Sequence, residues 1–180
     1  VAAQLLIQLT GERQDQVEAD MDRVGEICLD HDALDVLVAR DAARRDQLWE
    51  ARRLIIEALK HESPIHHMED LSVPRAKIPE LLGAVHAMSE RLGLRALCFG
   101  HAGDGNVHVN LMKDDLSDEQ WEAKWRVAQR ELYALAISLG GAITGEHGIG
   151  ATRKAFLAET IGQKPVELME WCLSFAPDAK

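Results

Sequence analysis

Two short glycine-rich segments hold the side chains of this sequence that are best suited to chemistry. The first is Gly-His-Ala-Gly-Asp-Gly-Asn-Val-His at 100–108, and the second is Gly-Glu-His-Gly-Ile-Gly at 145–150. Imidazole nitrogens and carboxylate oxygens bind zinc, iron and manganese, and glycines let a backbone approach a ligand closely. Together the two segments predict a metal site.

The first segment predicts a β-hairpin with Asp104-Gly105 at its turn, because this dipeptide is favoured in two-residue loops. Pairing outward from that turn places His101 directly opposite His108, with Cβ atoms about 5 Å apart. Asn110 lies two residues beyond His108 and shares its face. Two imidazoles would then converge on one ion. The alternative is that both histidines are polar residues on the solvent side of a hairpin.

The second segment supplies a carboxylate and another imidazole. Glu146 would complete a three-ligand set with His101 and His108, which leaves coordination positions open as in catalytic zinc sites. His147 then remains free to transfer a proton. The alternative is an ordinary surface turn, because glycine-rich polar stretches are usually loops.

The rest of the chain must supply the elements that position these side chains. Strand patterns occur at 5–9, 35–39, 65–73 and 94–99. Helix patterns occur at 17–28, 48–59, 78–92, 121–139, 151–160 and 163–174. A capping box at 117–120 marks the start of one helix. This alternation predicts an α+β fold with a ferredoxin-like antiparallel sheet covered by helices.

Composition and charge narrow the classes of function. The length of 180 residues suits one domain. A net charge of −10 argues against nucleic-acid partners. The absence of a bilayer-length apolar run and of a secretory leader pattern predicts a cytoplasmic location. Cys28, Cys98 and Cys172 are too far apart for an iron-sulfur motif and are expected to be buried thiols.

Both glycine-rich segments, in this order and with a tryptophan-containing helix between them, resemble the signatures of the FAD-linked oxidase C-terminal domain. This family belongs to the vanillyl-alcohol oxidase superfamily and is of the glycolate oxidase, D-lactate dehydrogenase and D-2-hydroxyglutarate dehydrogenase type. Segments 48–52 and 69–75 extend the resemblance. It implies that residues 1–180 are a substrate-capping domain, a fragment of a longer chain whose N-terminal FAD-binding domain is absent.

The resemblance also implies roles for single residues. His101, His108 and Glu146 match the family's ligands to a divalent metal, for which we expect zinc, with ferrous iron or manganese as alternatives. His147 matches the catalytic histidine, which also contacts the substrate.

Two further residues match substrate-contacting positions of the family. Asn110 is one, and Arg52 is the other, where an arginine binds the substrate carboxylate. Arg44 and Arg53 are nearby competitors for that role. Ile56 replaces a threonine that contacts substrate in the hydroxyglutarate branch, so a second substrate carboxylate is not expected.

The activity implied by the resemblance is the FAD-dependent oxidation of a 2-hydroxy acid to a 2-oxo acid, with FAD bound mainly by the absent domain. Implied partners are the substrate, the FAD-binding domain and an electron-transfer subunit that would provide peripheral membrane association. Self-association through the flavin-facing surface is also expected, whereas the chain alone should be inactive. The alternatives are an autonomous metallohydrolase with the same ligands and a non-catalytic ferredoxin-like interaction domain.

Overall fold

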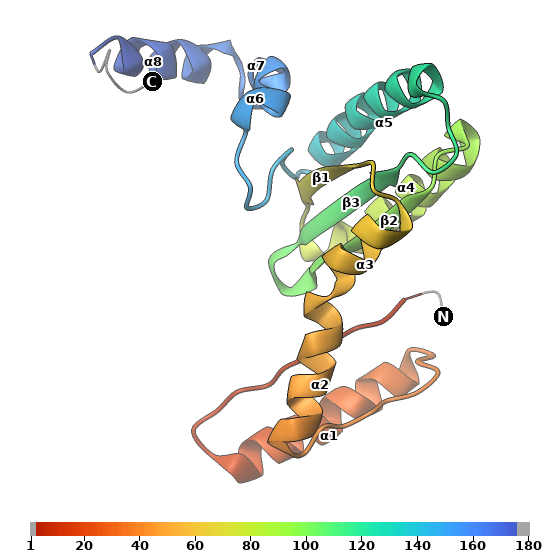
Figure 1. Cartoon of the computed structure of the whole chain (residues 1–180). Helices are drawn as coiled ribbons and strands as arrows, with labels where there is room; N and C mark the ends of the chain where they lie inside the picture. The colour runs from red at the N-terminus through yellow and green to blue at the C-terminus, as the bar shows by residue number, and fades with distance from the viewer. Residues whose placement is uncertain (1–2, 176–180) are drawn as a thin grey trace. The chain divides into compact units, whose positions relative to one another are not determined.

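The structure is a computed structural model that describes residues 3–175, and a three-stranded antiparallel sheet forms the centre of its part from residue 59 onward. Its strands are β1 (His66–Ser72), β2 (Ala96–His101) and β3 (Asn106–Met112). Because β1 and β2 both pair antiparallel with β3, which lies between them, they are parallel to each other. The crossover that joins them contains α4 (Ile78–Leu92) (Figure 1).

The order of elements in this part of the chain is that of a ferredoxin-like fold. The β2–β3 hairpin follows α4, and α5 (Asp118–Ser138) follows the hairpin. Ala142 then pairs with Ser72 at the outer edge of β1 through a single antiparallel bridge. In a β-α-β-β-α-β unit the last strand occupies such an edge. The predicted α+β class and antiparallel sheet are therefore confirmed, with the last strand shortened to one bridge.

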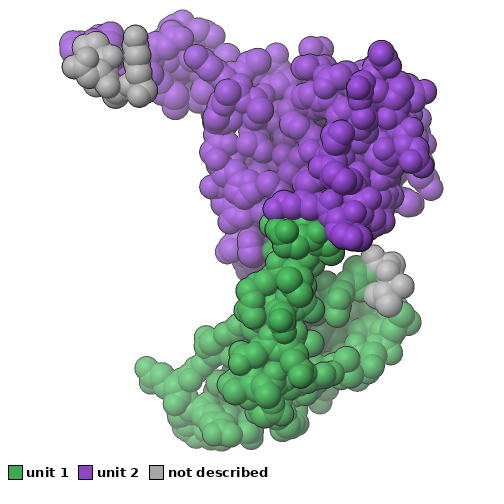
Figure 2. Space-filling view, viewed as in Figure 1, with its two compact units in different colours: residues 1–58 green, residues 59–180 purple. Residues whose placement is uncertain are grey.

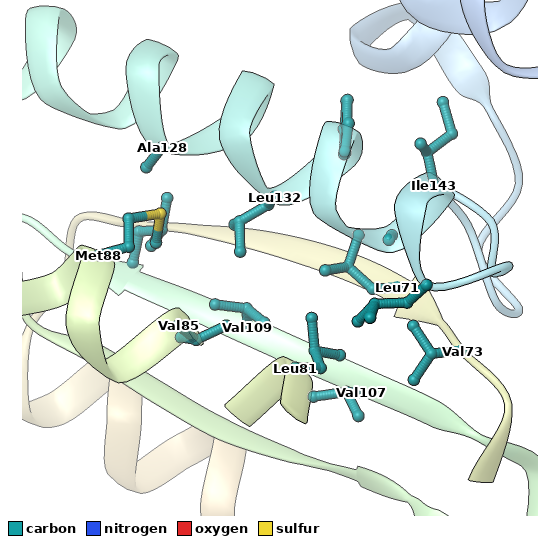
Figure 3. Close-up of a cluster of buried hydrophobic side chains, with 14 of the residues drawn as sticks. Leu71, Val73, Leu81, Val85, Met88, Val107, Val109, Ala128, Leu132 and Ile143 are labelled. Carbon is teal, nitrogen blue, oxygen red and sulfur yellow. The ribbon is translucent and has the colours of Figure 1, made fainter. Parts of the chain in front are cut away.

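The hydrophobic core lies between one face of the sheet and the two helices α4 and α5 (Figure 3). Alternate residues of β3 point toward these helices, as the two-residue period of a strand requires. The buried apolar side chains include Leu71, Leu81, Val85, Val107, Val109, Leu111 and Leu132. Asp70 of β1 and His108 of β3, which pair directly, lie on the other face of the sheet.

Local signals determine where the helices begin and end. Ser117 and Gln120 form the predicted capping box at the start of α5, and each satisfies a backbone N–H of the other. Gly93 closes α4 in the left-handed conformation that glycine tolerates. The other helices of this part are α6 (Gly150–Arg153), α7 (Leu157–Ile161) and α8 (Gln163–Ser174), with short 3-10 helices η1 (Arg75–Lys77), η2 (Ala102–Asp104) and η3 (Lys154–Phe156).

The chain divides into two compact units, Val1–Ala58 and Leu59–Lys180 (Figure 2). Helices α1 (Gln14–Asp30) and α2 (Ala42–Arg53) belong to the first unit, and α3 (Ile55–Glu62) spans the boundary. The strands predicted at 5–9 and 35–39 were wrong, because neither segment forms a strand. An apolar pattern alone does not make a strand, since the backbone also needs a neighbouring strand for its hydrogen bonds.

The predicted two-residue turn was also wrong. Residues 102–104 form the 3-10 helix η2, and Gly105 completes a four-residue loop at φ +75°. His101 therefore pairs with Asn106 rather than with His108, and His108 pairs with Phe99. The register differs from the predicted one by two residues, an even number, so His101 and His108 still share the face opposite the core.

Two other expectations concern the surface. The cysteine prediction was wrong for two residues, because Cys98 and Cys172 are exposed, whereas Cys28 is half-buried. Within residues 3–175, no helix combines the length and apolarity needed to cross a membrane.

The two glycines of the β2–β3 loop provide a matched pair for testing this turn. Gly105→Ala would place a methyl group 2.0 Å from the Val73 carbonyl oxygen, in a backbone conformation that costs alanine about 1–2 kcal/mol. Gly103→Ala would meet no atom within 4 Å. We expect urea denaturation to show a loss of at least about 1 kcal/mol for Gly105→Ala and a near-neutral Gly103→Ala. Equal effects would contradict the observed loop.

Candidate metal and catalytic site

The polar face of the sheet brings the two glycine-rich segments together. His108 lies on the central strand and His101 at the end of β2. After α5, the Ser72–Ala142 bridge directs the chain back to β1, so that the loop carrying Glu146 reaches the same face. The pairing of β2 with β3 and the Ser72–Ala142 bridge therefore bring the two segments to the same face.

The three predicted ligands converge. Oε1 of Glu146 lies 3.0 Å from Nε2 of His108 and 3.7 Å from Nε2 of His101. One ligand atom from each of these residues lies within 4.8 Å of the others. Small side-chain rotations would bring the three atoms to the bond lengths of about 2.1 Å that one divalent ion requires. The structure thus assembles a two-histidine, one-carboxylate set.

His108 provides the strongest sign that this set suits a cation. Its side chain is 6% exposed, and neither ring nitrogen has an aligned hydrogen-bond partner. Burial lowers the pKa of His108, a shift that the nearby carboxylates of Asp70 and Glu146 oppose. A neutral imidazole is the form that binds metal. Because buried polar atoms normally have partners, a metal ion at Nε2 would satisfy this nitrogen, and the residues fit such an ion.

A buried carboxylate holds the loop that carries Glu146. Oδ2 of Asp70 accepts a hydrogen bond from the Thr144 hydroxyl at 2.9 Å. It also accepts bonds from the backbone N–H groups of Gly145, Glu146 and His147 at 2.9, 2.9 and 2.8 Å. Consecutive N–H groups that converge in this way form an anion-binding concavity. The Asp70 side chain therefore determines the backbone position of two predicted functional residues.

The hydrogen bonds from residues 144–147 to the carboxylate of Asp70, called the Asp70 clamp below, affect both the pKa of Asp70 and the packing around it. Burial acts to raise the pKa of Asp70, but hydrogen bonds from the N–H groups of His147 and Glu146 and from the Asn106 amide outweigh it and hold the pKa well below its ordinary value. A Cβ atom at Gly145 would lie 2.0 Å from Nδ2 of Asn106. Only glycine lets the loop approach Asp70 this closely.

The predicted catalytic histidine lies at the open side of the cluster. The ring of His147 contacts that of His108 edge to face, with centroids 4.9 Å apart. Its Nε2 lies 3.6 Å from Oε1 of Glu146, and its side chain is 37% exposed. It is therefore accessible to a small molecule, as a proton-transfer group must be.

The two residues predicted to contact the substrate, Asn110 and Arg52, lie in different units and have different surroundings. Asn110 shares the face of His108 but is buried, and its Nδ2 donates to the Leu97 carbonyl at 3.2 Å. That contact gives Asn110 a structural function, and its binding of substrate stays a prediction. Arg52 is a half-buried residue of α2 in the first unit, and its role also stays a prediction.

Sequence reasoning did not assign a role to Asp70. The available signal was two consecutive acidic residues, Glu69 and Asp70, inside a strand-like segment. Carboxylates are almost never fully buried unless they have partners. Such a pair therefore predicts hydrogen-bond or ionic partners within the protein, although only the folded structure identifies them.

Comparison with known proteins identifies the family of the chain. Residues 1–172 match the family model described as FAD linked oxidases, C-terminal domain. The chain belongs to this family. It is 33% identical to a D-lactate dehydrogenase of Anaerostipes hadrus and 35% identical to a glycolate oxidase subunit GlcD of Bacillus subtilis, over 170 residues in each case.

These alignments cover 94% and 93% of this chain but only 36% and 35% of the two relatives. A D-2-hydroxyglutarate dehydrogenase of Stutzerimonas stutzeri is 28% identical over 140 residues, which are 76% of this chain and 30% of that relative. The chain thus spans about a third of the length of the curated relatives that it matches.

The clamp predicts a pH dependence of stability. Because folding lowers the pKa of Asp70, the unfolded state binds more protons than the folded state below about pH 4. The ionised Asp70 side chain therefore contributes its full stabilisation above the pKa that Asp70 has in the unfolded state. This contribution is lost as the pH falls toward the lower pKa that Asp70 has in the folded state. Asp70→Asn should lower stability at pH 7 and flatten its decline from about pH 4 to pH 2, as measured by urea denaturation.

The matched control is Asp115→Asn, which removes an exposed carboxylate. It should leave both the stability at pH 7 and the decline in acid close to those of the wild type. An Asp70→Asn variant with the wild-type pH profile would show that the clamp contributes nothing.

Proposed function

We propose that this chain is the substrate-binding and metal-binding cap of a FAD-dependent dehydrogenase that oxidises small 2-hydroxy acids, of the glycolate or D-lactate type, to 2-oxo acids. The observation that carries the proposal is the convergence of His101, His108 and Glu146 beside the accessible ring of His147. The names of the relatives support this class of substrate. They do not choose among its members.

The three converging side chains would hold the metal. His108 is the buried, fixed member of the set, and His101 and Glu146 are half-exposed members that face outward. A divalent ion bound there, with zinc as the first choice, would supply a Lewis acid that orients the substrate and lowers the pKa of its hydroxyl group. Two histidines and one carboxylate leave room for substrate oxygens.

His147 would accept the hydroxyl proton at Nε2. Its backbone N–H donates to Asp70, so the main chain is held while the ring stays free to meet the substrate. A base in this state is both oriented and accessible, which general acid-base catalysis requires. FAD, when bound by the rest of the parent enzyme, would supply the acceptor for the α-hydrogen as hydride.

Partners and location follow from the same proposal. Arg52 would bind the substrate carboxylate and Asn110 another substrate oxygen. The FAD-binding domain would cover the face that carries His147, and an electron-transfer subunit would reoxidise the flavin. The whole enzyme would be cytoplasmic, with peripheral membrane attachment through that subunit, and the isolated cap would self-associate through its uncovered face.

Metal content tests the ligand set. We expect the purified chain to bind one equivalent of Zn²⁺, Fe²⁺ or Mn²⁺, and the variant with both His101→Ala and His108→Ala to bind none, by elemental analysis after dialysis. The matched control is the variant with both His61→Ala and His86→Ala, two exposed histidines on helices outside the site. Loss of metal in both variants, or in neither, would contradict the assignment.

Turnover tests the base. In the flavoprotein that contains this chain, His147→Ala should lower kcat by about 10²- to 10⁴-fold, the usual contribution of general acid-base catalysis. Metal content should remain unchanged, and stopped-flow reduction of the flavin by D-lactate or glycolate gives the rate. An active His147→Ala enzyme would remove the base assignment. Hydrolysis of ester substrates by the zinc-loaded chain alone would instead favour a metallohydrolase.

A further inference from the structure

A buried arginine contacts the far end of the loop that carries Glu146 and His147. Arg153, the last residue of α6, is 8% exposed. Its Nη1 donates to the carbonyl oxygen of Gly148 at 3.1 Å, and its Nη2 donates to that of Met68 at 3.5 Å. One guanidinium group therefore joins the residue after His147 to strand β1.

A buried carboxylate accompanies this guanidinium. Oε2 of Glu69 lies 3.6 Å from Nε of Arg153. Glu69 is fully buried on the helix-facing side of β1, where it accepts hydrogen bonds from the Tyr133 hydroxyl at 2.6 Å and from Nε2 of Gln129 at 2.7 Å. Both of these partners belong to α5. The carboxylate of Glu69 thus lies between Arg153 and two side chains of α5.

The loop is held on both of its polar sides. Asp70 binds its N–H groups at 145–147, and Arg153 binds the carbonyl of Gly148. Both residues connect the loop to the same strand, because Asp70 belongs to β1 and Arg153 contacts the β1 carbonyl of Met68. A turn fixed at its amides and at its next carbonyl has little freedom to rotate the side chains between them.

We infer that Arg153, supported by Glu69, is a positioning residue that fixes the loop orientation in which Glu146 and His147 function. The inference rests on the proposed function and extends it to the opposite face of the sheet. Nη1 and Nη2 of Arg153 donate to the two carbonyls, whereas Nε has no aligned hydrogen-bond partner. Because removing one partner of a buried ion pair is itself destabilising, the test of positioning must measure metal binding and not stability alone.

Co²⁺ binding to the 180-residue chain tests the inference without flavin. We expect Arg153→Met to raise the Kd for Co²⁺ about 10- to 100-fold, the usual effect of removing an outer-shell support, and to alter the visible Co²⁺ spectrum. Arg153→Lys should recover part of the affinity, since an ammonium group can still donate to the Gly148 carbonyl. Arg130→Met, an exposed arginine of α5, should leave Kd and spectrum unchanged.

The outcomes separate this inference from the proposed function. A wild-type chain that binds no Co²⁺ would overturn both. Wild-type binding with unchanged affinity and spectrum in Arg153→Met would overturn the positioning role alone. If thermal melting shows that Arg153→Met does not fold, Arg153→Gln decides, because its shorter amide cannot reach both carbonyls. A folded Gln variant with wild-type affinity and spectrum would equally overturn the positioning role.

Discussion

The hydrogen bonds to the buried carboxylate of Asp70 are the interaction on which the arrangement of the site depends. A fully buried carboxylate is strongly unfavourable unless donors surround it. Here one hydroxyl and three consecutive backbone N–H groups converge on a single oxygen. Because β1 is held in the sheet by β3 and by the packing of α5, the position of this oxygen is set by the core. The loop then takes its conformation from the core, although it contributes little apolar surface itself.

Adjacent residues of β1 connect the two sides of the sheet. Side chains alternate along a strand, so Asp70 points to the face of the histidines and Glu69 points to α5. The same alternation along β3 separates the core residues Val107 and Val109 from His108. The two buried carboxylates hold neighbouring parts of one loop, Asp70 directly and Glu69 through Arg153. A change in how α5 packs would therefore be transmitted through a single strand to the loop that carries Glu146, one of the proposed metal ligands.

Much of this fold could be predicted because its signals are local. The capping box at Ser117, the left-handed Gly93 and the apolar periodicity of α4 and α5 need no distant partner. The shared face of His101 and His108 also followed from strand alternation, and it survived the wrong turn because the register error was even. Asp70 and Arg153 could not be assigned, because their contacts join residues about eighty positions apart. The segments at 5–9 and 35–39 have the apolar pattern of strands but form none, because the pattern does not reveal whether another strand is available for pairing.

The side chains that converge at the site differ in their exposure to solvent. His108 is buried, whereas the side chains of Glu146 and His147 are 46% and 37% exposed on a backbone held by Asp70. The role of base that we propose for His147 needs an accessible ring, but a freely moving ring would lose much of its advantage to conformational entropy. Hydrogen bonds to the main chain resolve this conflict, because they orient the residue without covering its side chain. Glycines at 145 and 148 are consistent with this solution, since the first permits the close approach to Asp70 and the second permits the left-handed turn that follows His147.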